Sequence, residues 1–148
     1  MPEEAEERAQ EDKREGKSPS TQAGEFVREE MEHIREGKHG ARSPAQAIAI
    51  GLSKARRAGV KLPPPKRGKA RTKRQARRDL AKGRKGRRRK PSRSRSRATR
   101  GALKRENSRS ASRKALSRQA KRAARRRSAR SRSSAAKKAA HTRKRRRR

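Results

Sequence analysis

The sequence predicts a mostly disordered chain with one small all-α helical hairpin and a long basic disordered tail. Three observations predict this class. The 148 residues carry 52 Lys and Arg against 14 Asp and Glu, a net charge of +38. Only 25% of the residues are hydrophobic, whereas globular domains have about 45–50% apolar residues. Helical spacing of larger apolar side chains occurs in one stretch, residues 18–60, so most of the chain is expected to bury too little apolar surface to fold.

Charge divides the chain sharply. Residues 1–60 carry 12 acidic and 11 basic side chains, whereas residues 61–148 carry 41 basic and two acidic ones, Asp79 and Glu106. The Pro run at residues 63–65 favours a stiff extended spacer at this boundary. We therefore expect an acidic flexible leader, a hairpin, a Pro-rich linker that holds the tail away from the hairpin, and a disordered nucleic-acid-binding tail. Their ranges are 1–17, 18–60, 61–68 and 69–148.

The leader is rich in helix-forming residues but shows no apolar face, so any helix in it should fray in water. The first helix of the hairpin is expected over about residues 21–36. Ser20 or Thr21 can cap its start, and Gly37 can end it. Its apolar residues share one face: Ala23, Phe26, Val27, Met31 and Ile34.

The second helix is expected over about residues 44–58. Ser43-Pro44-Ala45-Gln46 combines a capping Ser, Pro at the first helical position and Gln three residues after the cap. Gly59 follows as a C-terminal stop, and Val60 can fold back onto the last turn. Ile48 and Leu52 lie on its apolar face.

Two helices of this size offer too few large apolar side chains to fold alone, because domains below about 40 residues usually need a further staple. We therefore expect the hairpin to form a homo-oligomer or to order on binding a partner. The predicted self-association residues are Phe26, Val27, Met31, Ile34, Ile48 and Leu52.

The stretch 18–66 resembles a bacterial domain family of unknown function that occurs in small, very basic proteins. The residues that carry the resemblance are Gln22-Ala23-Gly24-Glu25-Phe26, the link from Gly37 to Ser43, and the segment from Gln46 to Gly59. This resemblance implies no activity. The tail resembles, in composition alone, the carboxy-terminal domains of linker histones and bacterial histone-like proteins.

The tail is predicted to bind the phosphates of double-stranded DNA. Of the 52 basic residues 35 are Arg, whose planar guanidinium pairs bidentately with phosphate. Forty-one basic side chains could match the charge on roughly 20 base pairs, and ten phosphate contacts would give a salt slope near about −9. The predicted nucleic-acid-binding residues are Lys66, Arg67, Lys69, Arg71, Lys73, Arg74, Arg77, Arg78, Arg84, Lys85, Arg87, Arg88, Arg89, Lys90, Arg122, Arg125, Arg126, Arg127, Arg143, Lys144, Arg145, Arg146, Arg147 and Arg148.

Duplex DNA is favoured over RNA because single-strand modules stack bases on aromatic rings, and the only aromatic residue, Phe26, is needed in the hairpin. Arg can also stack, so RNA is possible. The segments Lys85-Gly86-Arg87-Arg88 and Lys66-Arg67-Gly68-Lys69 resemble the core of a minor-groove AT-hook, and plain phosphate contact is the alternative.

Two further features of the tail bear on DNA binding. The Ser-Arg repeat over residues 92–97 would lose DNA affinity on phosphorylation, although Ser is also an ordinary flexible spacer. Residues 111–127 alternate Ala with Arg and Lys. We expect this segment to change from coil to helix on DNA.

No catalytic or metal site is expected. Glu30 and His33 have a spacing found in di-iron ligand pairs, but such sites also need Glu ligands from separate helices. His39 and His141 have no evident partner in the sequence. The chain contains no cysteine, no nucleotide-binding motif and no run of about 18 apolar residues that could cross a membrane. We therefore predict no cofactor, no enzyme activity and no membrane association.

The sequence as a whole predicts a low-specificity DNA-binding, histone-like nucleoid-associated protein of the cytoplasm. Its tail would neutralise and bridge duplex phosphates, and its hairpin would self-associate. One alternative is an RNA-binding polycation. The other is an adaptor whose hairpin docks a specific protein partner.

Overall fold

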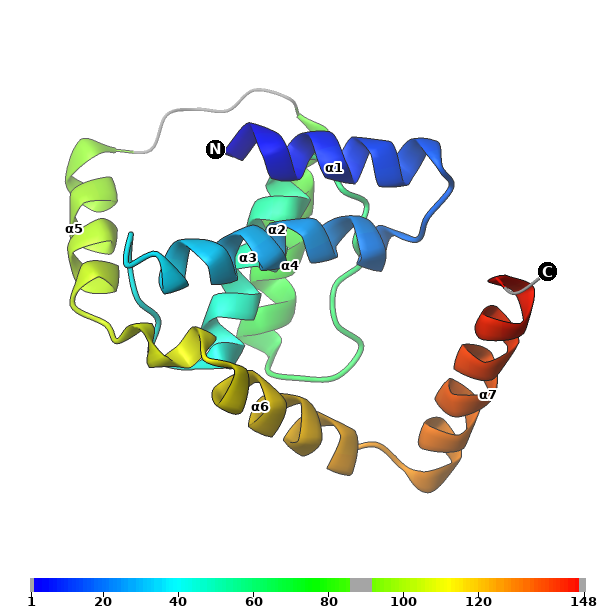
Figure 1. Cartoon of the computed structure of the whole chain (residues 1–148). Helices are drawn as coiled ribbons and strands as arrows, with labels where there is room; N and C mark the ends of the chain where they lie inside the picture. Colours follow the sequence, from blue (N-terminus) through cyan, green and yellow to red (C-terminus); the bar gives the residue numbers. More distant parts are fainter. Residues whose placement is uncertain (1, 86–91, 147–148) are drawn as a thin grey trace. The chain divides into compact units, whose positions relative to one another are not determined.

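The structure is a computed structural model that describes residues 2–85 and 92–146. In these ranges the chain forms seven α-helices, one 3-10 helix and no strand (Figure 1). The chain divides into two compact units, Met1–Ser112 and Arg113–Arg148. The helices are α1 (Pro2–Arg14), α2 (Pro19–Arg35), α3 (Pro44–Arg57), α4 (Ala70–Arg84), α5 (Arg93–Lys104), η1 (Ser108–Ala111), α6 (Arg113–Arg125) and α7 (Ala129–Arg146).

The predicted fold class, a mostly disordered chain with a two-helix hairpin and a disordered basic tail, is wrong. Helices cover most of the segment that was expected to be a disordered tail, from α4 to α7. The prediction took into account only the high net charge and the small apolar surface that the segment can bury. Ala, Arg and Lys are also strong helix formers, and these residues dominate the segment. Residues 111–127 therefore need no DNA to become helical, since α6 already spans most of them.

The two helices expected in the N-terminal half are present as α2 and α3. Ser18 caps α2 and accepts a hydrogen bond from the backbone N–H of Thr21, so the cap lies two residues before the earlier of the two expected capping residues. Ser43 caps α3 as expected and accepts from the backbone N–H of Gln46 at 3.2 Å. Beyond α3, Gly59 has φ +99°, a left-handed conformation that favours glycine.

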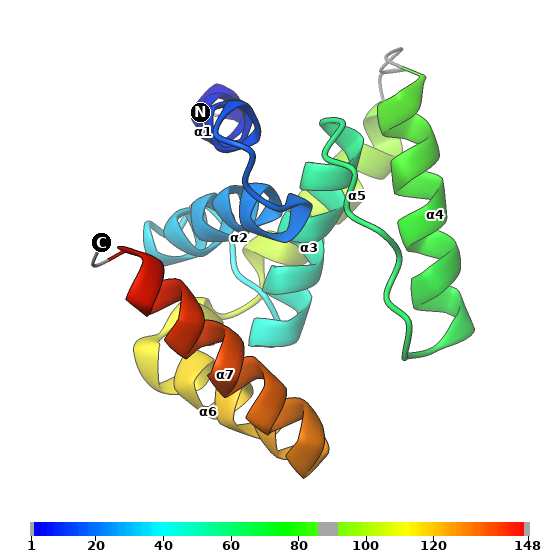
Figure 2. The same cartoon turned by 90° about the vertical axis from the view of Figure 1, so that its right-hand side faces the viewer.

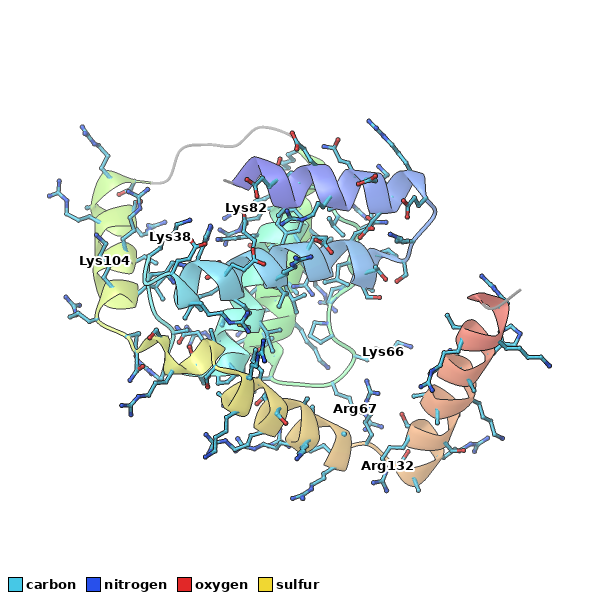
Figure 3. The ribbon with its side chains drawn as sticks, viewed as in Figure 1. Lys38, Lys66, Arg67, Lys82, Lys104 and Arg132 are labelled. Carbon is cyan, nitrogen blue, oxygen red and sulfur yellow. The ribbon has the colours of Figure 1, made fainter. Side chains whose placement is uncertain are left out.

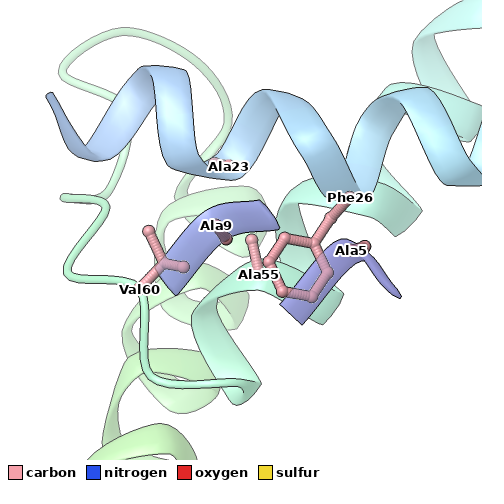
Figure 4. Packing of buried hydrophobic residues seen from close by; sticks show 6 residues of the cluster. All are labelled: Ala5, Ala9, Ala23, Phe26, Ala55 and Val60. Carbon is pink, nitrogen blue, oxygen red and sulfur yellow. The ribbon is translucent and has the colours of Figure 1, made fainter. Parts of the chain in front are cut away.

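The end of α3 forms a Schellman motif. The backbone N–H of Val60 donates to the carbonyl of Ala55 at 3.1 Å, and that of Gly59 donates to Arg56 at 3.2 Å. Val60 is thereby directed into the core with Ala55 (Figure 4). Helices α2 and α3 cross closely at Gly51, where a Cβ would lie 2.7 Å from the Cα of Val27.

The expected flexible leader is instead helix α1, packed on α2. Ala5 and Ala9, four residues apart on one face, are buried against the core that contains Phe26 (Figure 4). Arg8 Nε donates to Glu25 Oε2 at 2.8 Å and ties the two helices at their polar edge. The prediction that α1 frays is wrong because two alanines are a sufficient apolar face when the neighbouring helix approaches closely.

The Pro-rich linker does not hold the following segment away from the hairpin. Arg56 is buried and donates from Nε to the carbonyl of Leu62 at 3.2 Å and from Nη2 to that of Pro63 at 3.3 Å. These bonds hold the linker against α3, and α4 then packs alongside α3 (Figure 2). Gly83 permits this contact, because a Cβ there would overlap the carbonyl oxygen of Arg56.

The segment after α5 returns to the hairpin and completes the first unit. The backbone N–H of Gly40 donates to the carbonyl oxygen of Leu103 at 2.9 Å, and the backbone N–H of Ala41 donates to the carbonyl oxygen of Asn107 at 3.2 Å. Arg35 Nε donates to the carbonyl of Ala111 at 3.0 Å, and η1 packs against α2 and α3. The segment from Leu103 to Asn107 therefore holds the link between α2 and α3 in place.

The second unit consists of α6 and α7. Its 36 residues include 18 Lys and Arg and no acidic residue. No side chain is buried in the described part of this unit, and only Ala115, Leu116 and Gln119 are half-buried. Within the described ranges of the whole chain, none of the helices is long and apolar enough to span a lipid bilayer.

Candidate nucleic-acid interface

Helix α4 has one buried face and one cationic face. Ala76 and Asp79 are buried on the side that packs against α3, and Gly83 lies against Arg56 on the same side. At about 100° per residue, a row of basic residues falls on the opposite side at spacings of 3, 4, 4 and 3. The members of this row, called here the α4 stripe, are Arg71, Arg74, Arg78, Lys82 and Lys85, and all five are exposed.

The single acidic residue between positions 61 and 105 is turned away from the α4 stripe. Asp79 is fully buried, and its Oδ1 accepts from Arg57 Nε at 2.7 Å. The amide of Gln75 donates to the same oxygen at 3.1 Å. Because the one carboxylate of this segment is neutralised on the inner side by a residue of α3, the outer side carries positive charge only.

The loop before α4 adds further cations. Lys66, Arg67 and Lys69 are exposed, and Figure 3 shows Lys66 and Arg67 projecting from this loop. Gly68, which lies between Arg67 and Lys69, has φ +120°. This conformation lets the chain turn into the helix. This loop holds one of the two predicted AT-hook-like segments, and Gly86, Arg87 and Arg88 of the other lie outside the described residues.

Most of the predicted nucleic-acid-binding residues are at the surface. In residues 66–85 every predicted member is exposed except Lys73, which is half-buried. The predicted basic residues of the second unit are also exposed: Arg122, Arg125, Arg126, Arg127, Arg143, Lys144 and Arg145. The remaining predicted positions, Arg87 to Lys90 and the side chains of Arg146 to Arg148, lie outside the description.

Sequence reasoning missed Lys82, which completes the α4 stripe, and it missed the basic side chains of α5. Lys104 is exposed at the end of α5, and both lysines are marked in Figure 3. The 3.6-residue period over residues 70–85 is a signal that would have found Lys82. Glu106, which follows α5, is also paired, because its Oε1 lies 3.5 Å from Arg42 Nε.

The predicted self-association residues are largely used inside the first unit. Phe26, Met31 and Ile34 are buried, with exposed fractions of 3%, 6% and 0%. Val27, Ile48 and Leu52 are half-buried. Helix α1 packs on the core that contains Phe26, and η1 packs on α2 and α3. Homo-oligomer formation through these residues stays a prediction.

The Ser-Arg repeat has a structural role at its first residue. Ser92 caps α5 and accepts from the backbone N–H of Arg95 at 3.4 Å. Its hydroxyl also lies 2.8 Å from that of Ser94. This serine is therefore more than a spacer between charges.

The expectation that His39 has no partner is wrong, because its Nδ1 lies 3.2 Å from the carbonyl oxygen of Gly40. Its Nε2 lies 3.4 Å from Glu30 Oε1, and its ring is 6.3 Å from that of His33 between centroids. Burial lowers the pKa of His33, and the charges of Lys38 and Lys54 act in the same direction. The spacing of Glu30 and His33 pointed to two members of this cluster, but no sequence signal predicted His39 as the third, because only the folded link brings it back to α2.

Comparison with known proteins identifies one segment. Residues 15–67 match the model of a family of unknown function, DUF6496. This match confirms the resemblance of residues 18–66 to an uncharacterised domain family. The matched residues include α2, α3 and most of the linker. No curated protein and no solved structure matches the chain.

Proposed function

We propose that this protein binds double-stranded DNA with low sequence specificity, neutralising the phosphates and bridging duplex segments. The observation that carries the proposal is the division of α4 into an outer row of basic side chains and an inner face that holds the only carboxylate of its segment. Such a surface presents no negative charge to a polyanion.

The dimensions of the α4 stripe suit a duplex. From Arg71 to Lys85 the helix rises about 21 Å at about 1.5 Å per residue. The major groove is about 12 Å wide, so the long side chains of one such helix can reach phosphates on both of its sides. Binding releases condensed counterions and therefore weakens with salt.

Low specificity follows from the chemistry of the exposed side chains. Lys and Arg that contact phosphates position a protein on DNA but read no sequence. Gln75 is the residue of α4 best suited to read adenine, and its amide is bound to Asp79. Phe26 is buried and cannot stack on unpaired bases, which favours a duplex over a single strand.

Bridging rests on the presence of two cationic units. The second unit has 18 basic residues without any acidic residue, and its described basic side chains are exposed. Each unit can bind its own stretch of phosphates, and a chain that engages two duplex segments brings them together. This activity would place the protein on the nucleoid of a bacterial cell.

The test is a titration of a mixed-sequence 30-base-pair duplex followed by fluorescence anisotropy at several salt concentrations. The first variant combines Arg71→Gln, Arg74→Gln and Arg78→Gln. The matched control combines Arg14→Gln, Arg28→Gln and Lys38→Gln, which removes the same charge from exposed residues outside the α4 stripe.

The stripe variant is expected to lose at least about ten-fold in affinity and to reduce the salt slope by about 2.7, as three lost phosphate contacts require. The control should lose much less. Equal losses in the two variants would contradict a role for the α4 stripe. Stronger competition by a structured RNA than by unlabelled duplex at equal phosphate would favour RNA as the ligand instead.

A further inference from the structure

The end of α2 and the link that follows it bring together three side chains with metal-binding atoms. Glu30 and His33 are three residues apart on α2 and therefore share one side of the helix. Gly37 has φ +75° and reverses the chain, so that His39 returns to the same place. One ligand atom of each of these three side chains lies within 4.8 Å of the other two.

The orientation of His39 is fixed by the backbone. Its Nδ1 lies 3.2 Å from the carbonyl oxygen of Gly40, and a carbonyl only accepts hydrogen bonds. The neutral ring therefore carries its proton on Nδ1 and leaves the lone pair of Nε2 free. Metal-binding histidines in proteins show this arrangement, in which the other ring nitrogen donates to a carbonyl or carboxylate.

Glu30 offers one oxygen to the same space. It is fully buried, and its Oε2 accepts from Lys54 Nζ at 2.6 Å. Its Oε1 has no hydrogen-bond partner among the described residues and faces His39 Nε2 at 3.4 Å. A buried carboxylate oxygen without a hydrogen bond is costly, and two lone pairs that face each other repel unless a cation lies between them.

We propose that Glu30, His33 and His39 bind one Zn²⁺ ion through Glu30 Oε1 and one ring nitrogen of each histidine. Zinc–ligand distances of about 2.0–2.1 Å separate two ligands of a tetrahedral ion by about 3.4 Å. Glu30 Oε1 and His39 Nε2 already have this separation. A ring nitrogen of the half-buried His33 lies within 4.8 Å of the other two ligand atoms. A small movement of this ring towards them completes the set, and water fills the fourth position.

Lys54 sets the strength of this site. Its ammonium group holds Glu30 in place through Oε2, but its positive charge also repels the ion. Replacing Lys54 with methionine removes this repulsion and frees the second carboxylate oxygen, so the variant is expected to bind zinc more tightly than the wild type.

The ion would strengthen the first unit where the link meets the later part of the chain. His39 precedes Gly40 and Ala41, whose N–H groups bind the segment around Leu103 and Asn107. Fixing His39 to α2 therefore also fixes the attachment of the segment between α5 and η1. This role is structural, and it is independent of whether the protein binds DNA.

The experiment titrates the full chain, without a histidine tag and in phosphate-free buffer, with Co²⁺ as the visible-absorption probe and then with Zn²⁺ as competitor. The chain has three histidines and no cysteine, so His141→Gln is a matched control for His39→Gln and His33→Gln. His141 is exposed in the second unit, and Lys54→Met and Glu30→Gln complete the set.

We expect one Co²⁺ per chain, displaced by Zn²⁺. Loss of an outer-shell partner costs about 10–100-fold in metal affinity, so His39→Gln and Glu30→Gln should cost at least about 100-fold. His141→Gln should bind as the wild type does. Zinc should also raise the melting temperature of the wild type and of His141→Gln, but not of His39→Gln.

Three results would overturn the proposal. One is the absence of a saturable one-to-one cobalt spectrum up to millimolar metal. Another is equal loss of binding in His141→Gln and His39→Gln. The third is a proton on His39 Nε2 at pH 7.5, seen by nitrogen NMR, that added zinc does not displace, because the cation between Glu30 and His39 would then be a proton.

Discussion

The two units of this chain are both helical, but their helices depend on different forces. In Met1–Ser112 the helices α1 to α4 bury Ala5, Phe26 and Ile34 and pair buried carboxylates with cations of neighbouring elements. In Arg113–Arg148 no described side chain is buried, so α6 and α7 rely on intrinsic propensity. The comparison shows that a very basic chain can build a packed unit in which buried carboxylates such as Glu30 and Asp79 pair with cations of neighbouring helices, and that it can remain helical in a unit without acidic residues.

The comparison is tested most strongly by removing the second unit. A chain that ends at Ser112 loses 18 of its 52 basic residues but keeps every helix contact of the first unit. We expect it to remain folded and to lose about 10³-fold in duplex affinity at physiological salt, since several phosphate contacts disappear together. Anisotropy measures the affinity and circular dichroism measures the fold. Loss of cooperative unfolding in this variant would show that the units are not separate.

The next largest effect is expected at the core of the first unit. Phe26→Ala removes a buried ring that packs with Ala55 and Val60 (Figure 4). Substitutions of this kind cost about 3–5 kcal/mol, and the loss should appear as a lower denaturant midpoint in circular dichroism. The helical signal of α6 and α7 should be unaffected. A proportional loss of helix in the second unit would contradict the difference in stabilising forces.

Gly83 and Gly24 form a matched pair within helices of the first unit. Gly24→Ala should stabilise by about 0.5–1 kcal/mol, as for an open helical position, because a Cβ there has no neighbour within 4 Å. Gly83→Ala should instead destabilise by about 1–3 kcal/mol, because its Cβ would overlap the carbonyl oxygen of Arg56. Chemical denaturation of both variants measures the change in the free energy of unfolding, which should have opposite signs in the two. Stabilisation by Gly83→Ala would show that α4 does not pack on α3.

A smaller effect is expected from Asp79→Asn. The substitution leaves Arg57 without its carboxylate, and Arg57 is 49% exposed, so water compensates part of the loss. We expect a destabilisation of about 1–2 kcal/mol. Duplex affinity should not fall, because the variant has one more net positive charge. A loss of duplex affinity in an Asp79→Asn chain that remains folded would contradict the inward role of Asp79.

Local signals predicted part of this fold. The sequence from Ser43 to Gln46 and the glycine at position 59 located α3 within one residue at its end. The apolar spacing from Ala23 to Ile34 located α2. These features act between neighbours in the chain, so they can be read without knowing the tertiary structure.

The remaining features depend on contacts between distant residues. Ala5 and Ala9 become a packing face only because α2 lies next to them. The inward position of Asp79 depends on Arg57, 22 residues earlier. The cluster of Glu30, His33 and His39 depends on the reversal at Gly37. A composition rule that counts charges and apolar residues takes no account of these placements.

The most direct test of the central claim is the salt dependence of the full chain's affinity for two unrelated 30-base-pair duplexes. The account predicts equal affinities for the two sequences, and a linear fall of log K with log salt concentration at a slope of about −9 or steeper. Failure to bind either duplex in dilute buffer, or unchanged affinity in half-molar sodium chloride, would contradict it.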